Sequence, residues 1–136
     1  MTLVEALQRD EGLRLAMYRD AVGVNTIGYG HNLDAKPISK HAADVILDDD
    51  IRDATADVLR ALPWTAHLDP PRFDAFVNLA FNLGIDGLLK FRHFLAAAQA
   101  GSWATAAMEL RDSTWFCQVG DRGARVVAQI FDGVAR

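Results

Sequence analysis

The sequence predicts an α+β fold: a small N-terminal lobe with a short antiparallel sheet, a long connecting helix, and an all-helical C-terminal lobe. Three observations support this prediction. Short strand signals and glycines gather at residues 17–34. One helical periodicity then runs over about 40–61 without a break. The apolar positions that follow recur at helical spacing.

The first element is a short helix. Thr2 and Glu5 match the Thr-x-x-Glu capping box that opens a helix. Leucine and valine side chains at positions 3, 4 and 7 give this helix an apolar side. Gly12 is expected to end it, because glycine often follows the last helical residue. Glu11 therefore falls at the C-terminal end of the helix.

A small sheet of two or three antiparallel strands is expected next. The strand signals are Tyr18, the segment 22–24 and the segment 26–29, which are rich in β-branched and aromatic residues. Glycines at 23, 28 and 30 mark turns or places where backbones approach closely.

The longest predicted helix covers about 40–61. Ser39 is a suitable N-cap, and apolar residues recur with a period of 3.6 up to Leu62. At 1.5 Å per residue this helix is roughly 33 Å long. Pro63 is expected to end it. So long a helix in a small chain is typical of a connection between two lobes.

Helices are expected throughout the rest of the chain. Asp69 and Pro70 form a helix start, and the helix that follows is apolar almost all round up to Gly84, which is expected to end it. Shorter helices are predicted at about 86–100, 102–111, with Ser102 as N-cap, and 121–132. We expect a single domain, residues 1–136. Lobe one covers about 12–62, and lobe two covers about 63–136 together with the N-terminal helix. A cleft is expected between the lobes.

Composition excludes several classes of protein. The 136 residues are enough for one packed core. The net charge of −4 is concentrated in the first half, which argues against nucleic-acid binding. No apolar segment is long enough for a membrane span, and the N-terminus lacks the pattern of a signal peptide. We therefore expect no stable membrane insertion.

Neither a disulfide nor a metal site is expected. Cys117 is the single cysteine, and we expect a small semi-buried residue there. The four histidines, at 31, 41, 67 and 93, do not have the spacing of metal ligands. We expect no cofactor.

Glu11 and Asp20 could serve as a pair of carboxylates for glycoside hydrolysis. Such a reaction needs one protonated acid and one ionised carboxylate. The negative end of the helix dipole favours the protonated form of Glu11, whereas a polar turn favours an ionised Asp20. Thr26 offers a hydroxyl that could hold a water molecule near Asp20. Two acids nine positions apart are common by chance, so this pattern alone only suggests catalysis.

A longer motif strengthens this interpretation. The segment "EGLRLAMYRDAVGVNTIGYGH" resembles the signature of phage-type lysozymes, glycoside hydrolase family 24. The pattern is Glu, eight residues, Asp, five residues, then Thr-Ile-Gly-x-Gly-His. The likeness continues in "FDAFVNLAFNLG" (73–84) and "STWFCQVGDRGARVV" (113–127). The resemblance implies a lysozyme-like fold of two lobes joined by a long helix.

The resemblance also implies roles for the three residues of the opening motif. Glu11 would be the general acid, Asp20 the second carboxylate, and Thr26 the residue that positions the attacking water. Family members generally invert the anomeric carbon, and we expect inversion here because Thr26 is present. Inverting enzymes separate their carboxyl groups by roughly 6.5–9.5 Å to leave room for that water.

Further positions are assigned as substrate-binding or supporting. The substrate-binding candidates are Tyr29, Gly30, Phe81, Asn82 and Trp115. For Tyr29 and Phe81, packing alone is an equally good explanation. In the family, His31 pairs with an acid on the long helix, here Asp50. Arg122 would pair with Glu11, although a surface arginine at a helix start is the simpler alternative.

The function implied by the resemblance is that of an endolysin-type muramidase. It would cleave the β-1,4 bond between N-acetylmuramic acid and N-acetylglucosamine in peptidoglycan glycan strands, as a monomer. It would be made in the host bacterial cytoplasm and need a holin to reach the wall. One alternative is hydrolysis of chitin or chitooligosaccharides. Another is a non-catalytic peptidoglycan- or glycan-binding domain that keeps the lysozyme fold.

Overall fold

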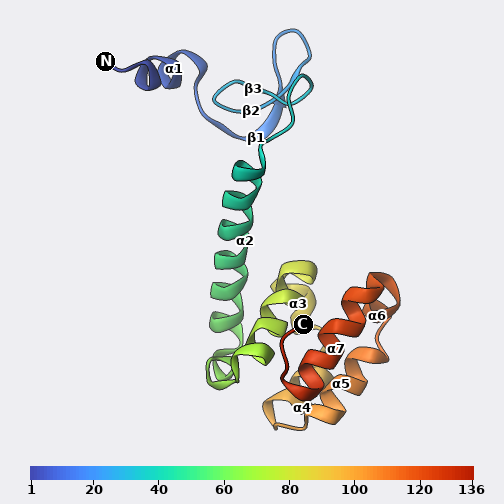
Figure 1. The fold of residues 1–136 in the computed structure, drawn as a ribbon. Helices are drawn as coiled ribbons and strands as arrows, with labels where there is room; N and C mark the ends of the chain where they lie inside the picture. Colours follow the sequence, from blue (N-terminus) through green and yellow to red (C-terminus); the bar gives the residue numbers. More distant parts are fainter. The chain divides into compact units, whose positions relative to one another are not determined.

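The computed structural model describes all residues, Met1–Arg136 (Figure 1). The chain divides into two compact units, Met1–Ile46 and Leu47–Arg136, called here the first and second unit. The elements are seven α-helices, one 3₁₀ helix and three strands in one antiparallel sheet. This composition confirms the predicted lysozyme-like α+β class. None of the helices combines the length and the apolar character that crossing a membrane requires.

The first unit begins with α1 (Leu3–Glu11), which is capped as predicted. The Glu5 backbone N–H donates to Thr2 Oγ1 over 3.1 Å, and the Thr2 N–H donates to Glu5 Oε2 over 2.7 Å. The hydrogen bond from the Thr2 backbone N–H, and secondly the Thr2 side chain, lower the pKa of Glu5. At Gly12 the backbone turns to φ +72°, which ends the helix directly after Glu11.

Three strands follow in the order β1 (Arg14–Arg19), β2 (Asn25–Gly28) and β3 (His31–Asn32). Thr26 lies opposite Tyr18 on one side and Asn32 on the other, and is therefore in the central strand. The expectation of a strand signal at 22–24 was wrong, because these residues belong to the turn between β1 and β2. Gly23, with φ +86°, provides the backbone conformation that this turn needs.

The long helix α2 (Lys40–Ala61) has the predicted bounds and contains the boundary between the two units. Ser39 caps it as predicted, because the Ala42 N–H donates to Ser39 Oγ over 3.0 Å. A 3₁₀ helix (Pro63–His67) follows it. On the second-unit part of α2, Ala54 and Val58 are buried.

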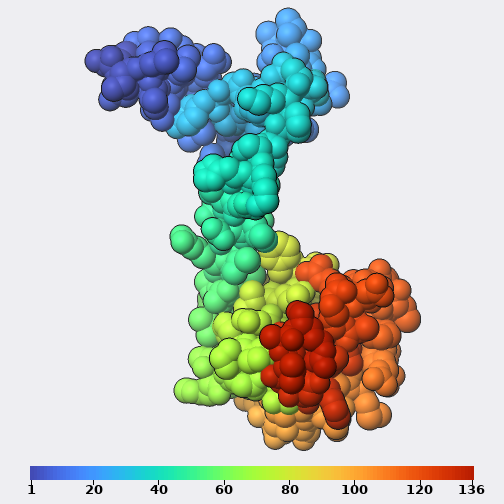
Figure 2. All heavy atoms as spheres, viewed as in Figure 1, coloured from blue at the N-terminus to red at the C-terminus, as the bar shows by residue number.

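The second unit is a cluster of helices. The bounds are α3 (Pro70–Leu89), α4 (Arg92–Gln99), α5 (Trp103–Arg111), α6 (Thr114–Val119) and α7 (Asp121–Asp132). Helix α7 packs against α3, α5 and α6, while α4 packs against α5 (Figure 1). In the space-filling view these helices form one continuous body (Figure 2). Its centre is aromatic and aliphatic, with Phe76 stacked on Phe94 at 5.3 Å between ring centroids.

Several predictions in this unit were wrong. Gly84 has φ +72° and interrupts α3, but the helix resumes and continues to Leu89. The helix predicted over 86–100 therefore begins too early. Its first residues belong to α3, and α4 begins at Arg92. The short helix α6 was not predicted, although Ser113 caps it by accepting the Phe116 N–H. Ser102 stands at the start of α5 without a side-chain capping bond, and Cys117 is exposed rather than semi-buried.

Arg72 joins the start of α3 to the end of α7. Its Nε and Nη2 atoms donate to the Ile130 and Phe131 carbonyls, each over 2.8 Å, at the C-terminal end of α7. Its guanidinium also lies 4.4 Å from the centre of the Trp103 ring. One arginine at the start of α3 thus satisfies carbonyls that α7 leaves free.

Candidate active site

Glu11 has a free carboxylate that lies against Gly30. It makes no hydrogen bond or ion pair and is exposed in the first unit. A Cβ atom built on Gly30 would come within 2.5 Å of Glu11 Oε2 and 2.9 Å of Cδ. Gly30 also has φ +69°, a conformation that other residues rarely adopt. The Gly30 backbone thus forms the surface on which the predicted acid rests.

Asp20 is held in a fixed orientation at the mouth of the β1–β2 turn. Its Oδ1 accepts the backbone N–H groups of Val22 and Val24, both over 2.9 Å. Its own backbone N–H donates to the Val24 carbonyl over 3.0 Å. Because Oδ1 takes both amide donors, the second carboxylate oxygen, Oδ2, has no protein partner and is free for a substrate or a water molecule.

Thr26 is anchored to the same residue as Asp20. Its hydroxyl donates to the Val24 carbonyl over 2.9 Å, and the residue is only 4% exposed. The N–H of Val24 therefore binds Asp20, while its carbonyl binds Thr26. Because the Thr26 proton is used in this bond, its oxygen can only accept from a further partner. Asp20 and Thr26 are thus both held by Val24.

Tyr29 and His31 flank Gly30 in the first unit. Tyr29 is 45% exposed, so nearly half of its surface is open to solvent. His31 Nε2 lies 2.9 Å from the Lys36 carbonyl oxygen. Since a carbonyl only accepts, this ring nitrogen carries the proton. Asp50 belongs to the second unit, and its pairing with His31 stays a prediction.

The substrate-binding candidates of the second unit lie on α3 and α6. Trp115 is buried, and its Nε1–H donates to Asn82 Oδ1 over 2.8 Å. This bond fixes the Asn82 side chain and leaves its amide N–H groups free. Phe81 is 42% exposed on the same helix. A pure core role for Phe81 is therefore excluded within this unit.

Arg122 opens α7 and is held by a residue that the sequence analysis missed. Its Nε donates to Asn78 Oδ1 over 2.9 Å. Both residues line a hollow of about 340 Å³ together with Phe81 and Asp74. The signal was present in the sequence, because Asn78 and Asn82 are four residues apart and thus share one face of an apolar helix. Pairing of Arg122 with Glu11 stays a prediction.

No group of three or more His, Cys, Asp or Glu side chains could hold a metal ion. The candidate residues offer carboxylates, hydroxyls and amides. In the first unit, the Glu11 carboxylate is unpaired and lies against Gly30. The Asp20 carboxylate is oriented by Val24, which also binds the Thr26 hydroxyl. This set can donate a proton and hold a water molecule, as glycoside hydrolysis requires.

Comparison with known proteins gives the same family as the motif. The model of the phage lysozyme family matches residues 8–129. The chain is 31% identical to the pre-baseplate central spike protein Gp5 of Enterobacteria phage T4, over 98% of the chain but only 28% of that protein. It is 28% identical to the probable T4-type lysozyme 1 of Dictyostelium discoideum, over 97% and 95% of the two chains.

An endolysin of Bacillus phage B103 is 34% identical over 78% of this chain and 41% of its own length. These relatives differ in length and in organism. The family match, over residues 8–129, includes all the candidate residues named above. Since it covers most of the sequence, the chain belongs to the phage lysozyme family and is an enzyme of the lysozyme type.

Proposed function

We propose that this enzyme is an endolysin-type muramidase that hydrolyses the β-1,4 bond between N-acetylmuramic acid and N-acetylglucosamine in bacterial peptidoglycan. Two observations from the first unit carry the proposal: Asp20 and Thr26 are both anchored on Val24, and Glu11 is unpaired. The names of the relatives, lysozyme and endolysin, support this substrate class.

In the proposed mechanism, Glu11 gives its proton to the oxygen of the glycosidic bond. An acid in this role needs access to the substrate, and Glu11 is exposed and has no ion-pair partner within the first unit. The Gly30 backbone limits where the carboxyl group can lie, because it fills the space below it. This contact supports orientation of the acid by packing rather than by a hydrogen bond.

Asp20 and Thr26 would hold the attacking water. Thr26 uses its proton on Val24, so a water molecule must donate one hydrogen to Thr26 Oγ1. If the water donates its second hydrogen to Asp20 Oδ2, its lone pair is left to attack the anomeric carbon. The reaction would then invert the configuration at that carbon, with Asp20 as the general base.

We further propose that Tyr29, Gly30, Phe81 and Asn82 contact the sugar rings. Asn82 has free amide N–H groups that could donate to an acetamido carbonyl, and Trp115 would act by holding that amide. Tyr29 and Phe81 offer partly exposed rings, which suit the apolar faces of sugars. His31, Asp50 and Arg122 would have supporting roles, through the His31–Asp50 and Arg122–Glu11 pairs.

The biological role that we propose is lysis of a bacterial host, by a monomer that reaches the wall after a holin has permeabilised the membrane. Two of the relatives are named endolysin, which supports this use. The alternatives are hydrolysis of chitin and a non-catalytic glycan-binding domain. If cells clear without new reducing sugar ends, neither muramidase nor chitinase activity is the cause of the clearing.

The decisive experiment compares wild type with Glu11→Gln on permeabilised Gram-negative cells and on purified peptidoglycan. We expect Glu11→Gln to lose at least about 100-fold in turbidity clearing and in released reducing ends. Asp10→Asn is the matched control, because Asp10 is an exposed acid on the same helix that pairs only with Arg9. Equal activity of wild type and Glu11→Gln would contradict the role of Glu11, and binding without hydrolysis by wild type would indicate the non-catalytic alternative.

Stereochemistry gives a second test. Proton NMR of fresh products should show inversion in the wild type. Thr26→Glu places a carboxylate where the water is held, so it should trap a covalent glycosyl adduct that mass spectrometry can detect. If Thr26→Glu behaves like Thr26→Ala, without an adduct, then Thr26 does not face the attacking water.

A further inference from the structure

The loop after β3 contains an aspartate that the proposed mechanism does not use. Asp34 is exposed, and it accepts two hydrogen bonds from one residue, Asn25. The Asn25 backbone N–H donates to Asp34 Oδ2 over 3.1 Å, and the Asn25 side-chain amide donates to Asp34 Oδ1 over 3.0 Å. Both carboxylate oxygens of Asp34 thus bind the residue that directly precedes Thr26 in the central strand of the sheet.

The Asn25 N–H belongs to the same peptide group as the Val24 carbonyl. That carbonyl accepts the Thr26 hydroxyl over 2.9 Å and the Asp20 backbone N–H over 3.0 Å. A trans peptide group is rigid and planar, so its N–H and its C=O point in opposite directions. Asp34 therefore holds one side of this peptide group, whereas Thr26 and Asp20 bind the other side.

The hydrogen bonds on the two sides of this peptide group strengthen each other. A hydrogen bond to a carboxylate is stronger than one to a neutral acceptor. It polarises the peptide group, so the carbonyl on the far side becomes a better acceptor. The Thr26 proton is then held more firmly on the Val24 carbonyl, and Thr26 Oγ1 is left to accept. This is the state in which Thr26 can take a hydrogen bond from the attacking water.

A further backbone bond joins the same two segments. The Asn25 carbonyl accepts the Leu33 N–H over 2.8 Å. Asn25 is thus bound through its N–H, its carbonyl and its side chain, all by residues 33 and 34. Because the Leu33 bond already ties the end of β3 to β2, the paired bonds to Asp34 act chiefly on the direction and polarisation of the Asn25 N–H.

We propose that Asp34 is a positioning residue for hydrolysis, which acts through the Val24–Asn25 peptide group on the orientation of the Thr26 hydroxyl. The proposal rests on the proposed muramidase function, since the water held by Thr26 belongs to that mechanism. Asp34 acts on the chemical step and not on substrate binding, because it orients a group that holds the water rather than the sugar.

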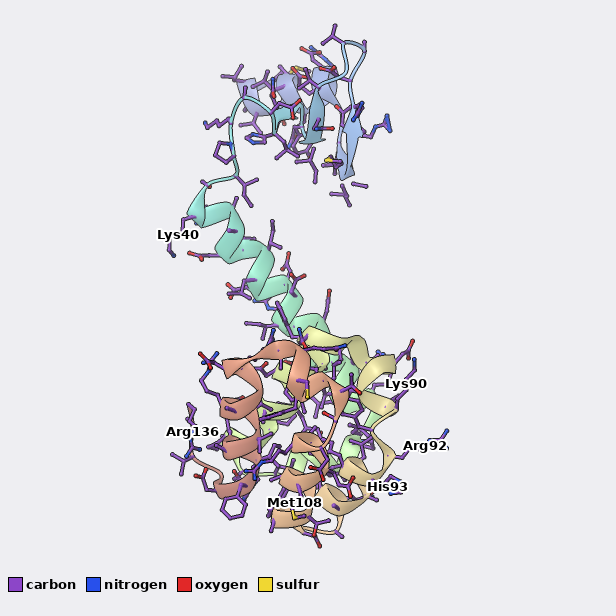
Figure 3. The ribbon with its side chains drawn as sticks, turned by 90° about the vertical axis from the view of Figure 1, so that its right-hand side faces the viewer. Lys40, Lys90, Arg92, His93, Met108 and Arg136 are labelled. Carbon is purple, nitrogen blue, oxygen red and sulfur yellow. The ribbon has the colours of Figure 1, made fainter.

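The kinetics of Asp34→Ala on peptidoglycan strands test this role. We expect kcat to fall about three- to tenfold, while KM stays within about twofold of wild type. In the Thr26→Ala background, Asp34→Ala should change kcat by less than about twofold, because no hydroxyl is left to orient. The control is Asp44→Ala, which should keep wild-type kinetics. Asp44 is an exposed acid of the same unit that pairs only with Lys40, on the first turn of α2 (Figure 3).

Exchange of the two side chains tests the same contact by rescue. Asn25→Asp alone places two carboxylates against each other and should lose more activity than Asp34→Ala. In Asn25→Asp/Asp34→Asn, the new amide oxygen at position 34 can accept the backbone N–H, and the new NH₂ group can donate to the carboxylate at position 25. This double variant should have a kcat at least about threefold above that of Asn25→Asp. Without such a recovery, the contact between the two side chains does not set the rate.

NMR separates this proposal from the proposed function. Asp34→Ala should move the amide proton signals of both Asn25 and Asp20 upfield, because the Asp20 N–H binds the carbonyl of the peptide group that Asp34 polarises. Asp44→Ala should move neither signal. An unchanged Asp20 signal, an equal loss of kcat with and without Thr26→Ala, or a higher KM at unchanged kcat would overturn the proposal. If wild type releases no reducing ends but the Asp20 signal still moves, the proposed function fails and the link from Asp34 through the peptide group stands.

Discussion

The carboxylate of Glu11 occupies the space that a side chain on residue 30 would need. A Cβ atom there would lie 2.5 Å from Glu11 Oε2, well inside van der Waals contact. Gly30 is therefore required by two independent conditions, its positive φ and the closeness of the acid. In the proposed mechanism, the second glycine of the Gly-x-Gly-His motif, Gly30, would act on catalysis through the position of Glu11.

Gly30→Ala should reduce hydrolysis much more than it reduces stability. The added methyl group must push the Glu11 carboxyl aside, and we expect at least a tenfold loss of kcat/KM. Gly28→Ala is the matched control, because Gly28 has the same φ of +69° but nothing within 4 Å of its Cβ position. Both variants should lose about 1 kcal/mol in unfolding free energy from backbone strain. Equal losses of activity in the two would show that strain, and not displacement of Glu11, is the cause.

Asp20 should have separable structural and catalytic roles. Its Oδ1 accepts two backbone N–H groups of the turn, which an asparagine oxygen can also do. Asp20→Asn should therefore keep the melting temperature but lose most hydrolysis, because the ionised oxygen that faces the water is gone. Asp20→Ala should lose activity and also about 1 kcal/mol of stability, because two amide donors lose their partner. Thermal unfolding and reducing-end assays on both variants measure this, and a strongly destabilised Asp20→Asn would contradict it.

The Trp115–Asn82 hydrogen bond should affect substrate binding without a direct contact by Trp115. Trp115→Phe removes the Nε1–H donor to Asn82 Oδ1 while keeping an aromatic ring in the core. The Asn82 side chain then loses its fixed orientation, and KM should rise about threefold or more. The double variant Trp115→Phe/Asn82→Ala should be no worse in KM than Asn82→Ala alone. Additive effects in this cycle would show that the two residues act separately.

The end of α7 should show a characteristic pH dependence. Hydrogen bonds from Arg136 and from the Val134 N–H lower the pKa of Asp132 to about 2. Because the folded pKa lies below the unfolded one, the stabilisation is complete above about pH 4 and is lost as pH falls through 2. Arg136→Gln should raise the Asp132 pKa, as measured by carboxyl NMR titration, and its stability difference from wild type should vanish near pH 2. Arg125→Gln, an exposed arginine on the same helix, should leave the Asp132 titration unchanged.

Much of this architecture could be predicted from local chemical signals. Thr2, Ser39 and Asp69 each cap the helix that the sequence assigned to them, because capping depends on residues three positions apart. The link between Asp20 and Thr26 was also predictable, since a short hairpin returns the chain to its starting point. By contrast, α6 has only six residues and no hydrophobic periodicity long enough to detect.

Other features depended on contacts that no local signal reports. Gly84 interrupts α3 but does not end it. The helix resumes because residues after Gly84, such as Leu88, are buried in the core. The role of Asn78 depends on Arg122, which lies 44 positions later.

The bonds from Arg72 to the Ile130 and Phe131 carbonyls span 58 and 59 positions of the chain. One side chain thereby closes the segment from α3 to α7 into a loop, so that the first turn of α3 and the last turn of α7 cannot separate without breaking these bonds. We expect fraying at the C-terminal end of α7 to be coupled to opening of the start of α3. Amide protons near Gln129 and Phe73 should exchange with a common opening free energy, which makes the second unit one cooperative folding block.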